Sequence, residues 1–272
     1  MTQGRDESVR PVAMAIGAHP DDIEFMMAGT LLMLKDAGAE SHMWNLANGN
    51  CGTAVHEHEE IIRLRWREAR DAARTAGAAI YPPLTNDIDL SYEKGLLAKV
   101  GAVIRQVKPR ILLVPSPVDY MEDHQNAVRL AVSAAFCRGM RNFPTDPPAP
   151  PWDGEMAVYH AMPYGLRDPL RRRIRPGQYV DVGPALATKR AMLACHRTQK
   201  EWLDVSQGLD AYLTAMEEMC REVGRMSGRF EYAEGWRRRL HLGFAADADR
   251  DPLSELLCES CWTDPAHEDS LG

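Results

Sequence analysis

Short apolar runs alternate with longer stretches of helical periodicity along most of the chain. Apolar or alternating runs predict strands at Val12–Ile16, Ser41–Ala47, Ala78–Tyr81, Ile111–Val114, Met156–Ala161 and Tyr179–Val182. A 3.6-residue period predicts helices over about 25–38, 57–76, 92–107, 124–139, 187–195 and 208–226. Strands that alternate with helices in this way indicate an α/β domain built on parallel strands.

The last part of the chain follows a different pattern. Residues 246–272 are acidic and rich in small side chains, which predicts a loosely held tail behind a single domain at 1–245. The Met-rich apolar stripe of the helix at 208–226 is typical of either a core or a subunit interface. A homo-oligomer is therefore one interpretation of that stripe.

Three residues able to bind a metal or a proton follow the first predicted strand. His19, Asp21 and Asp22 lie just after Val12–Ile16, and ligands of open α/β sheets gather at the carboxyl ends of strands. One imidazole and two carboxylates could supply two metal ligands and leave one carboxylate as a base. Asp21 or Asp22 could equally serve as an ordinary helix cap.

A further imidazole follows a second buried strand. His124 begins a helical pattern ten residues after Ile111–Val114, so two strand ends present His19, Asp22 and His124. Such a His-Asp-His set suits zinc and leaves positions open for water or substrate. Asp123 could hydrogen-bond a ligating imidazole, or could cap the helix.

These motifs and several others together resemble the PIG-L/LmbE-like family of zinc-dependent N-acetylglucosaminyl deacetylases. The resemblance extends over residues 10 to 200 or so and rests on His19-Pro20-Asp21-Asp22-Ile23-Glu24, Gly29-Thr30-Leu31, Asn48-Gly49-Asn50-Cys51-Gly52-Thr53, Arg65-x-x-Glu68-x-x-x-Ala72-Ala73, Asp123-His124 and Lys189-(x)6-His196-x-x-Gln199.

The resemblance implies a fold, a reaction and a set of residue roles. It implies a Rossmann-like, mostly parallel sheet with helices on both faces. One Zn²⁺ per chain would be held by His19, Asp22 and His124, with Asp21 as the general base of N-acetyl removal from a glycoconjugate. Arg65 would contact substrate, and Asp87 would hold a sugar hydroxyl; an Asx-turn or helix cap is the other interpretation of Asp87.

One position departs from the family pattern. The family usually has a histidine three residues before the downstream ligand, where this chain has Met121. A thioether cannot donate a hydrogen bond to a developing oxyanion, and losing such a donor typically lowers the rate about 10²–10³-fold. His160, Tyr120, Arg65 and His196 are candidate replacements. The alternative is a metal-binding relative that acts on a non-sugar amide or lacks deacetylase activity.

Composition narrows the partners and the compartment. With 32 basic and 39 acidic residues the net charge is −7, which argues against a general nucleic-acid binder. No apolar run of about 18 residues predicts a membrane span, and no secretory signal is expected in the first eleven residues. Six scattered cysteines are typical of a cytoplasmic protein, and the lone Cys258-x-x-Cys261 is most simply incidental. The expected partner is a small amide or glycoconjugate.

Overall fold

A twisted sheet forms the centre of the molecule in the computed structural model, which describes residues 10–207 and 211–271. Within those residues the sheet has eight strands in the order β3-β2-β1-β4-β5-β7-β6-β8. The strands are β1 (Val12–Gly17), β2 (Glu40–Asn45), β3 (Ala79–Tyr81), β4 (Ile111–Val114), β5 (Ala157–Ala161), β6 (Gln178–Asp181), β7 (Ala233–Arg238) and β8 (Cys261–Thr263). The first five pair in parallel, while β7, β6 and β8 pair antiparallel. The Rossmann-like parallel half confirms the expected fold class, and the antiparallel half extends it.

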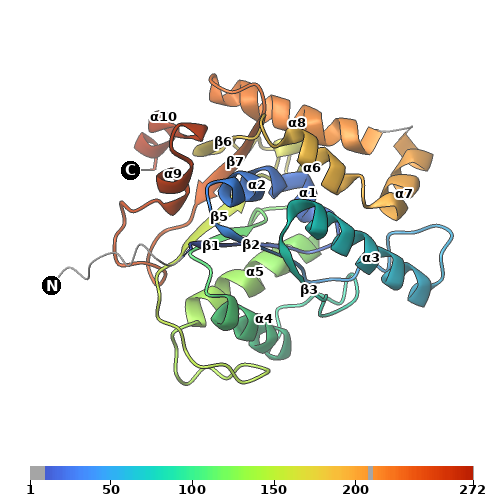
Figure 1. Cartoon of the computed structure of the whole chain (residues 1–272), viewed down its shortest axis with the longest axis horizontal. Helices are drawn as coiled ribbons and strands as arrows, with labels where there is room; N and C mark the ends of the chain where they lie inside the picture. The colour runs from blue at the N-terminus through green and yellow to red at the C-terminus, as the bar shows by residue number, and fades with distance from the viewer. Residues whose placement is uncertain (1–9, 208–210, 272) are drawn as a thin grey trace.

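Helices cover both faces of this sheet, as Figure 1 shows. The helices α4 (Lys94–Val107) and α5 (Glu122–Cys137) pack on one face. The other face carries α1 (Asp22–Met26), α2 (Ala28–Asp36), α3 (His58–Ala76), α6 (Leu186–Leu193), α7 (Arg197–Gln207) and α8 (Ala211–Ser227). The short elements are η1 (Tyr164–Leu166), α9 (Pro252–Leu257), η2 (Cys258–Ser260) and α10 (Pro265–Asp269).

Alternation along the central strands divides the core into two layers. In β1, Ala13 and Ala15 pack toward α1 and α2, whereas Met14 and Ile16 pack toward α4 and α5. Successive side chains of a strand point to opposite faces, and both faces of a parallel sheet are buried. The continuous apolar runs that predicted these strands are the result.

The first helix is shorter than its periodicity predicts. The stretch at 25–38 is divided at Met27, whose φ of −134° separates α1 from α2. The carboxylate of Glu234, from β7, accepts hydrogen bonds from the backbone N–H groups of Gly29 and Thr30 at 2.8 and 2.7 Å. This distant side chain caps a new helix start, so tertiary contact overrides a continuous helical pattern.

The expectation of a loosely held tail at 246–272 is wrong for the residues that the structure describes there. Strand β8 pairs with β6 in the main sheet, and the buried Leu253 and Leu257 of α9 join the core. Asp251 caps α9 through the N–H groups of Leu253 and Ser254. The acidic composition of this segment gave no indication of these few buried apolar residues. Residues 1–9 of the expected domain and residues 208–210 of the expected 208–226 helix lie outside the described part.

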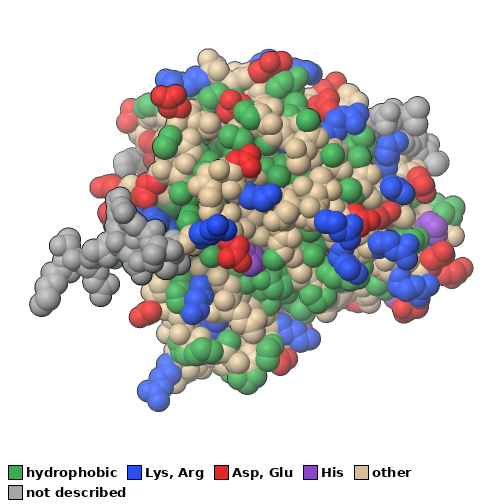
Figure 2. All heavy atoms as spheres, viewed as in Figure 1, with side chains coloured by type: hydrophobic (Ala, Val, Ile, Leu, Met, Phe, Trp, Pro, Cys, Tyr) green, Lys and Arg blue, Asp and Glu red, His purple; other side chains and the backbone are tan. Residues whose placement is uncertain are grey.

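Charge on the surface is mixed. Figure 2 shows Lys and Arg side chains interspersed with Asp and Glu over the face that carries α2 and α3. Within the described residues, no helix is long and apolar enough to cross a bilayer.

Candidate metal and catalytic site

The first two motifs meet because their strands are neighbours. β1 and β4 pair in parallel, so the segments after Gly17 and after Val114 leave the sheet at the same edge. A Cβ on Gly17 would lie 2.8 Å from Asn45 Oδ1 and 3.0 Å from Asp22 Cβ. Glycine is therefore required where the motif turns back over β1.

The turn after β1 is fastened by one of its own carboxylates. Asp22 Oδ2 accepts the backbone N–H groups of Ala18 and His19 at 2.9 and 2.8 Å. Asp21 occupies the N-cap position of α1 but makes no capping hydrogen bond, and its φ is 111°. Non-glycine residues in this region are strained and concentrate at functional sites. The simple cap interpretation is wrong for Asp21.

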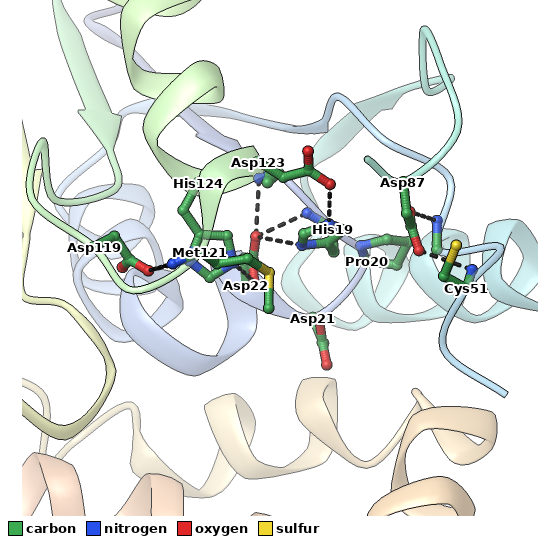
Figure 3. Close-up of polar contacts among 12 residues, drawn as sticks. His19, Pro20, Asp21, Asp22, Cys51, Asp87, Asp119, Met121, Asp123 and His124 are labelled. Atoms are coloured by element: carbon green, nitrogen blue, oxygen red, sulfur yellow. Dashed lines mark hydrogen bonds and ion pairs between the residues drawn. The ribbon is translucent and has the colours of Figure 1, made fainter. Parts of the chain in front are cut away.

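Three potential ligands converge beside this turn. His124 Nε2 lies 3.2 Å from Asp22 Oδ1, and His19 Nδ1 lies 3.7 Å from Asp22 Oδ2. One ligand atom from each of His19, Asp22 and His124 lies within 4.8 Å of the others. Figure 3 shows Asp22 between the two imidazoles.

Each imidazole has a second carboxylate on its far nitrogen. His19 Nε2 lies 2.9 Å from Asp123 Oδ2, and His124 Nδ1 lies 2.9 Å from Asp119 Oδ1. Carboxylates in these positions fix the tautomer and orientation of metal-binding histidines. The contact expected of Asp123 is thus present, and Asp119 supplies a matching one that the sequence analysis did not assign. The five-residue spacing from Asp119 to His124 was the available signal.

Without a cation, the negative charge of the neighbouring carboxylates favours the protonated forms of His19 and His124. Burial lowers the pKa of His19, but its hydrogen bonds to Asp123 and Asp22 outweigh burial and raise it to about 10. Burial opposes the charge of His124 too, yet the negative charge of Asp22 and the bond to Asp119 raise its pKa to about 11. A cation that binds here would replace these protons.

The trio fits a zinc ion by its chemistry. Two imidazole nitrogens and one carboxylate oxygen form a common three-ligand set for zinc, with positions left open. Across 10–207 and 211–271, His19, Asp22 and His124 are the group that meets this distance criterion.

Asp21 lies beside the trio but belongs to a different set of contacts. Figure 3 shows its carboxylate directed away from the two imidazoles, toward the neighbouring helices. Tyr212 of α8 donates its hydroxyl to Asp21 Oδ2, and Arg65 Nη2 lies 3.9 Å from the same oxygen. Burial raises the pKa of Asp21, although the charge of Arg65 works against that shift.

The comparisons with known proteins agree with this geometry. The family model described as PIG-L, GlcNAc-PI de-N-acetylase, matches residues 14–136, which include the whole trio and Asp21. The chain is therefore similar to the PIG-L family over residues 14–136.

Two diacetylchitobiose deacetylases are similar to this chain over most of its length. A diacetylchitobiose deacetylase of Thermococcus kodakarensis is 27% identical over 231 residues, which cover 82% of this chain and 81% of that protein. The N,N'-diacetylchitobiose deacetylase structure from Pyrococcus horikoshii has a TM-score of 0.72 at 21% identity, over 88% of each chain.

A hydratase shares the fold as well. GalB, the 4-carboxy-2-hydroxymuconate hydratase from Pseudomonas putida KT2440, has a TM-score of 0.68 at 22% identity, covering 84% of this chain and 95% of that one. Structural likeness at this identity establishes the fold, and a fold by itself does not determine the reaction.

The trio of His19, Asp22 and His124 opens into a cavity of about 360 Å³. This volume lies within the range of small-molecule sites. Its walls include His19, Asp21, Asp22, Phe25, Met26, Cys51, Gly52, Arg65, Asp87, Ile88, Tyr120, Met121, His124, Tyr164, Gln199, Trp202, Leu203, Tyr212 and Ala215.

Arg65 and Asp87, expected to contact substrate, line this cavity but also hold the backbone around it. Arg65 donates to the carbonyls of Gly49 and Pro20 at 3.2 and 3.0 Å. Asp87 accepts the N–H groups of Gly49 and Cys51 at 2.7 and 2.9 Å. Both residues therefore order the loop after β2.

The four candidate replacements for the missing donor divide into two pairs. Tyr120 and Arg65 line the cavity, whereas His160 and His196 do not. His160 lies 3.1 Å from the carbonyl of Pro115 through Nδ1, and His196 is fully buried 3.1 Å from Glu24. Met121 itself lines the cavity, as the sequence departure indicated.

The sequence analysis missed the cavity residues that come from the C-terminal half. Tyr164 of η1, Trp202 of α7 and Tyr212 of α8 have no motif around them. Their positions depend on how η1 and α8 meet Phe25 of α1 and on how α7 packs against α3, which no local pattern encodes.

Proposed function

We propose that this chain is a metal-dependent N-deacetylase. In this proposal it removes an N-acetyl or other N-acyl group from an N-acetylglucosamine-type glycoconjugate or glycosylated metabolite. The observation that carries the proposal is the convergence of His19, Asp22 and His124 at a cavity that is also lined by Asp21, a carboxylate outside the trio.

The relatives support the reaction class. One relative is a diacetylchitobiose deacetylase, and the structures with the same fold include a teicoplanin deacetylase in a zinc-inhibited form. The teicoplanin deacetylase has a TM-score of 0.60 at 14% identity, so it supports the assigned fold and carries no information about the substrate.

The proposed metal ligands are His19, Asp22 and His124, which would hold one Zn²⁺ per chain. The bound ion would supply positive charge that acidifies a water and polarises the amide carbonyl. Asp119 holds the His124 ring so that Nε2 points toward Asp22. Asp123 holds the His19 ring so that Nδ1 points toward Asp22.

Asp21 is the proposed general base. A water attacks the amide carbon while Asp21 takes its proton, so a C–O bond forms. The C–N bond then breaks as Asp21 returns that proton to the leaving nitrogen, which gives acetate and a free amine. A pKa raised by burial suits a carboxyl group that must accept a proton and then give it up.

Tyr120 and Arg65 are the proposed sources of the hydrogen bond that Met121 cannot supply. Both line the cavity, and Tyr120 packs against His124 with 5.8 Å between ring centroids. Burial raises the pKa of Tyr120 to about 12, so its hydroxyl stays protonated and able to donate at neutral pH.

The proposal is tested by acetate release from N-acetylglucosamine glycosides, with metal content measured on the same samples. We expect one zinc per chain, loss of activity in chelator and return of activity with zinc. Asp21→Asn is expected to lower kcat by about 10²–10⁴-fold with zinc content unchanged. Asp36→Asn, the same chemical change on the exposed end of α2, is the matched control and should leave both unchanged.

The outcomes distinguish the proposal from its alternative. Stoichiometric zinc with no hydrolysis of sugar amides would favour a PIG-L protein that acts on a non-sugar amide or on no amide at all. Wild-type turnover in Asp21→Asn would remove Asp21 from the role of base while leaving the metal assignment in place.

A further inference from the structure

The mouth of the cavity gathers exposed apolar side chains. Ile88, Tyr120, Tyr164 and Trp202 are 75%, 58%, 48% and 42% exposed, and all four line the same cavity. They come from four separate segments of the chain. Large exposed apolar residues are ordinarily scattered singly, and a cluster of them indicates a binding surface.

An aromatic wall continues from this rim into the cavity. Tyr164 lies 6.4 Å from Tyr120 and 5.4 Å from Phe25, measured between ring centroids. Phe25 in turn lies 5.6 Å from Tyr212, which hydrogen-bonds Asp21. These separations are typical of aromatic contacts, so the wall is continuous from solvent to the proposed base.

Ile88, which also lines the cavity, is held in a strained conformation. Its φ is 67°, a left-handed value that is an outlier for a β-branched residue. Its N–H donates to Asp123 Oδ2 at 2.8 Å, the carboxylate oxygen that also contacts His19. An exposed apolar side chain kept in such a conformation beside the metal ligands points to contact with a ligand.

Part of the polar wall is already engaged with the backbone. Each oxygen of Asp87 accepts one backbone N–H group, and two of the five N–H donors of Arg65 bond to backbone carbonyls. A sugar can use only the positions that remain on this side, while the aromatic wall adds a separate apolar surface.

We propose that the substrate carries an apolar, ring-shaped aglycone, which binds against Ile88 and the aromatic rim of Tyr120, Tyr164 and Trp202. The inference rests on the proposed function for the amide end of the substrate. The inference adds that the protein prefers a glycoside with an aromatic aglycone over the free sugar or its methyl glycoside.

The test compares two pairs of probes. Binding to the zinc-loaded protein is measured by calorimetry with phenyl and methyl β-D-glucosides, which contain no amide. Acetate release is measured with the corresponding N-acetylglucosaminides. We expect the phenyl glucoside to bind roughly tenfold more tightly, since one good aromatic contact is worth about that factor.

Variants locate the preference. Tyr164→Ala and Trp202→Ala should reduce the phenyl-to-methyl ratio toward one, whereas Tyr164→Phe, which keeps the ring, should retain it. Ile88→Asn should also lower the ratio, and asparagine accepts the left-handed conformation, so this variant should fold. Leu240→Ala truncates an equally exposed apolar residue away from the cavity and is the matched control.

Each result has one meaning. Equal affinities for the two glucosides, or a preference that survives the alanine variants, overturn the inference. Acetate release with equal affinities leaves the proposed function standing without the aglycone preference. A preference that the alanine variants abolish supports the inference even where no acetate is released, and in that case the proposed function fails.

Discussion

At the scale of single residues, the proposed metal ligands His19 and His124 are held by carboxylates outside the trio. Asp119 is fully buried and hydrogen-bonds His124 Nδ1, while Asp123 contacts His19. The convergence of the trio was predictable, because His19 and Asp22 follow β1 closely and His124 lies in the first turn of the helix after β4. Asp119 was not assigned, since aspartates are common in loops and only the fold brings its carboxylate to the ring nitrogen.

Asp119→Asn should weaken zinc binding by about 10–100-fold, because the amide no longer holds His124 as a basic ligand. Competition with a chromogenic chelator measures this change. Asp71→Asn, on the exposed surface of α3, is a control that should bind zinc as the wild type does. Unchanged affinity in Asp119→Asn would mean that His124 is oriented by packing alone.

At the scale of elements, the site is completed by helices that follow the family-matched region. Helix α8 supplies Tyr212 to Asp21, and α7 supplies Trp202 to the cavity. Both lie outside residues 14–136, so the chemistry of the first half depends on the packing of the second. Periodicity predicted both α8 and its apolar stripe, but not which residue of α8 reaches the strand-end turn.

Tyr212→Phe should lower kcat by about tenfold or more and leave KM and zinc content unchanged, because the lost hydrogen bond is made to Asp21. A hydrogen bond to a charged group contributes about 1.5–3 kcal/mol. Steady-state kinetics with metal analysis provide the measurement. Tyr232→Phe removes a hydroxyl that bonds Arg221 and is the matched control. A change in KM alone would assign Tyr212 to substrate contact.

The C-terminal segment provides a second prediction at this scale. Leu253 of α9 is fully buried in the core, so Leu253→Ala should lower the free energy of unfolding by about 2–5 kcal/mol. Leu271→Ala, in the same segment but 66% exposed, should change it little. Urea denaturation separates the two. Equal stabilities would restore the original view of residues 246–272 as a loose tail.

At the scale of the whole molecule, stability and metal binding are coupled through the protons of the site. In the metal-free protein the pKa values of His19 and His124 are raised to about 10 and 11. A raised pKa stabilises the fold fully below the unfolded value of about 6.5, and that contribution is lost as the pH rises through the folded values. The proposed zinc ion would bind the deprotonated imidazoles, so its effect on stability should have the opposite sign.

The metal-free protein should therefore lose thermal stability from pH 6.5 toward pH 10. The increase in Tm caused by zinc should instead be larger at pH 8 than at pH 6, because each displaced proton strengthens apparent binding about tenfold per pH unit. Thermal melts with and without zinc at both pH values provide the measurement. His124→Ala should abolish the zinc-dependent increase. A zinc effect that shrinks with pH would contradict the proposed ligands.

The sequence by itself determined the α/β class, the parallel half of the sheet and the strand-end position of His19, Asp22 and His124. These features are local. A short apolar run predicts a strand that is buried on both faces, and the residues that follow the run lie near the end of that strand. Tertiary structure alone decided the split between α1 and α2, the incorporation of β8 into the sheet, the partnership of Asp119 with His124 and the aromatic wall. Each of these four features brings together residues that are distant in sequence or depends on the direction in which a side chain points. The periodicity of the chain carries no information about such contacts.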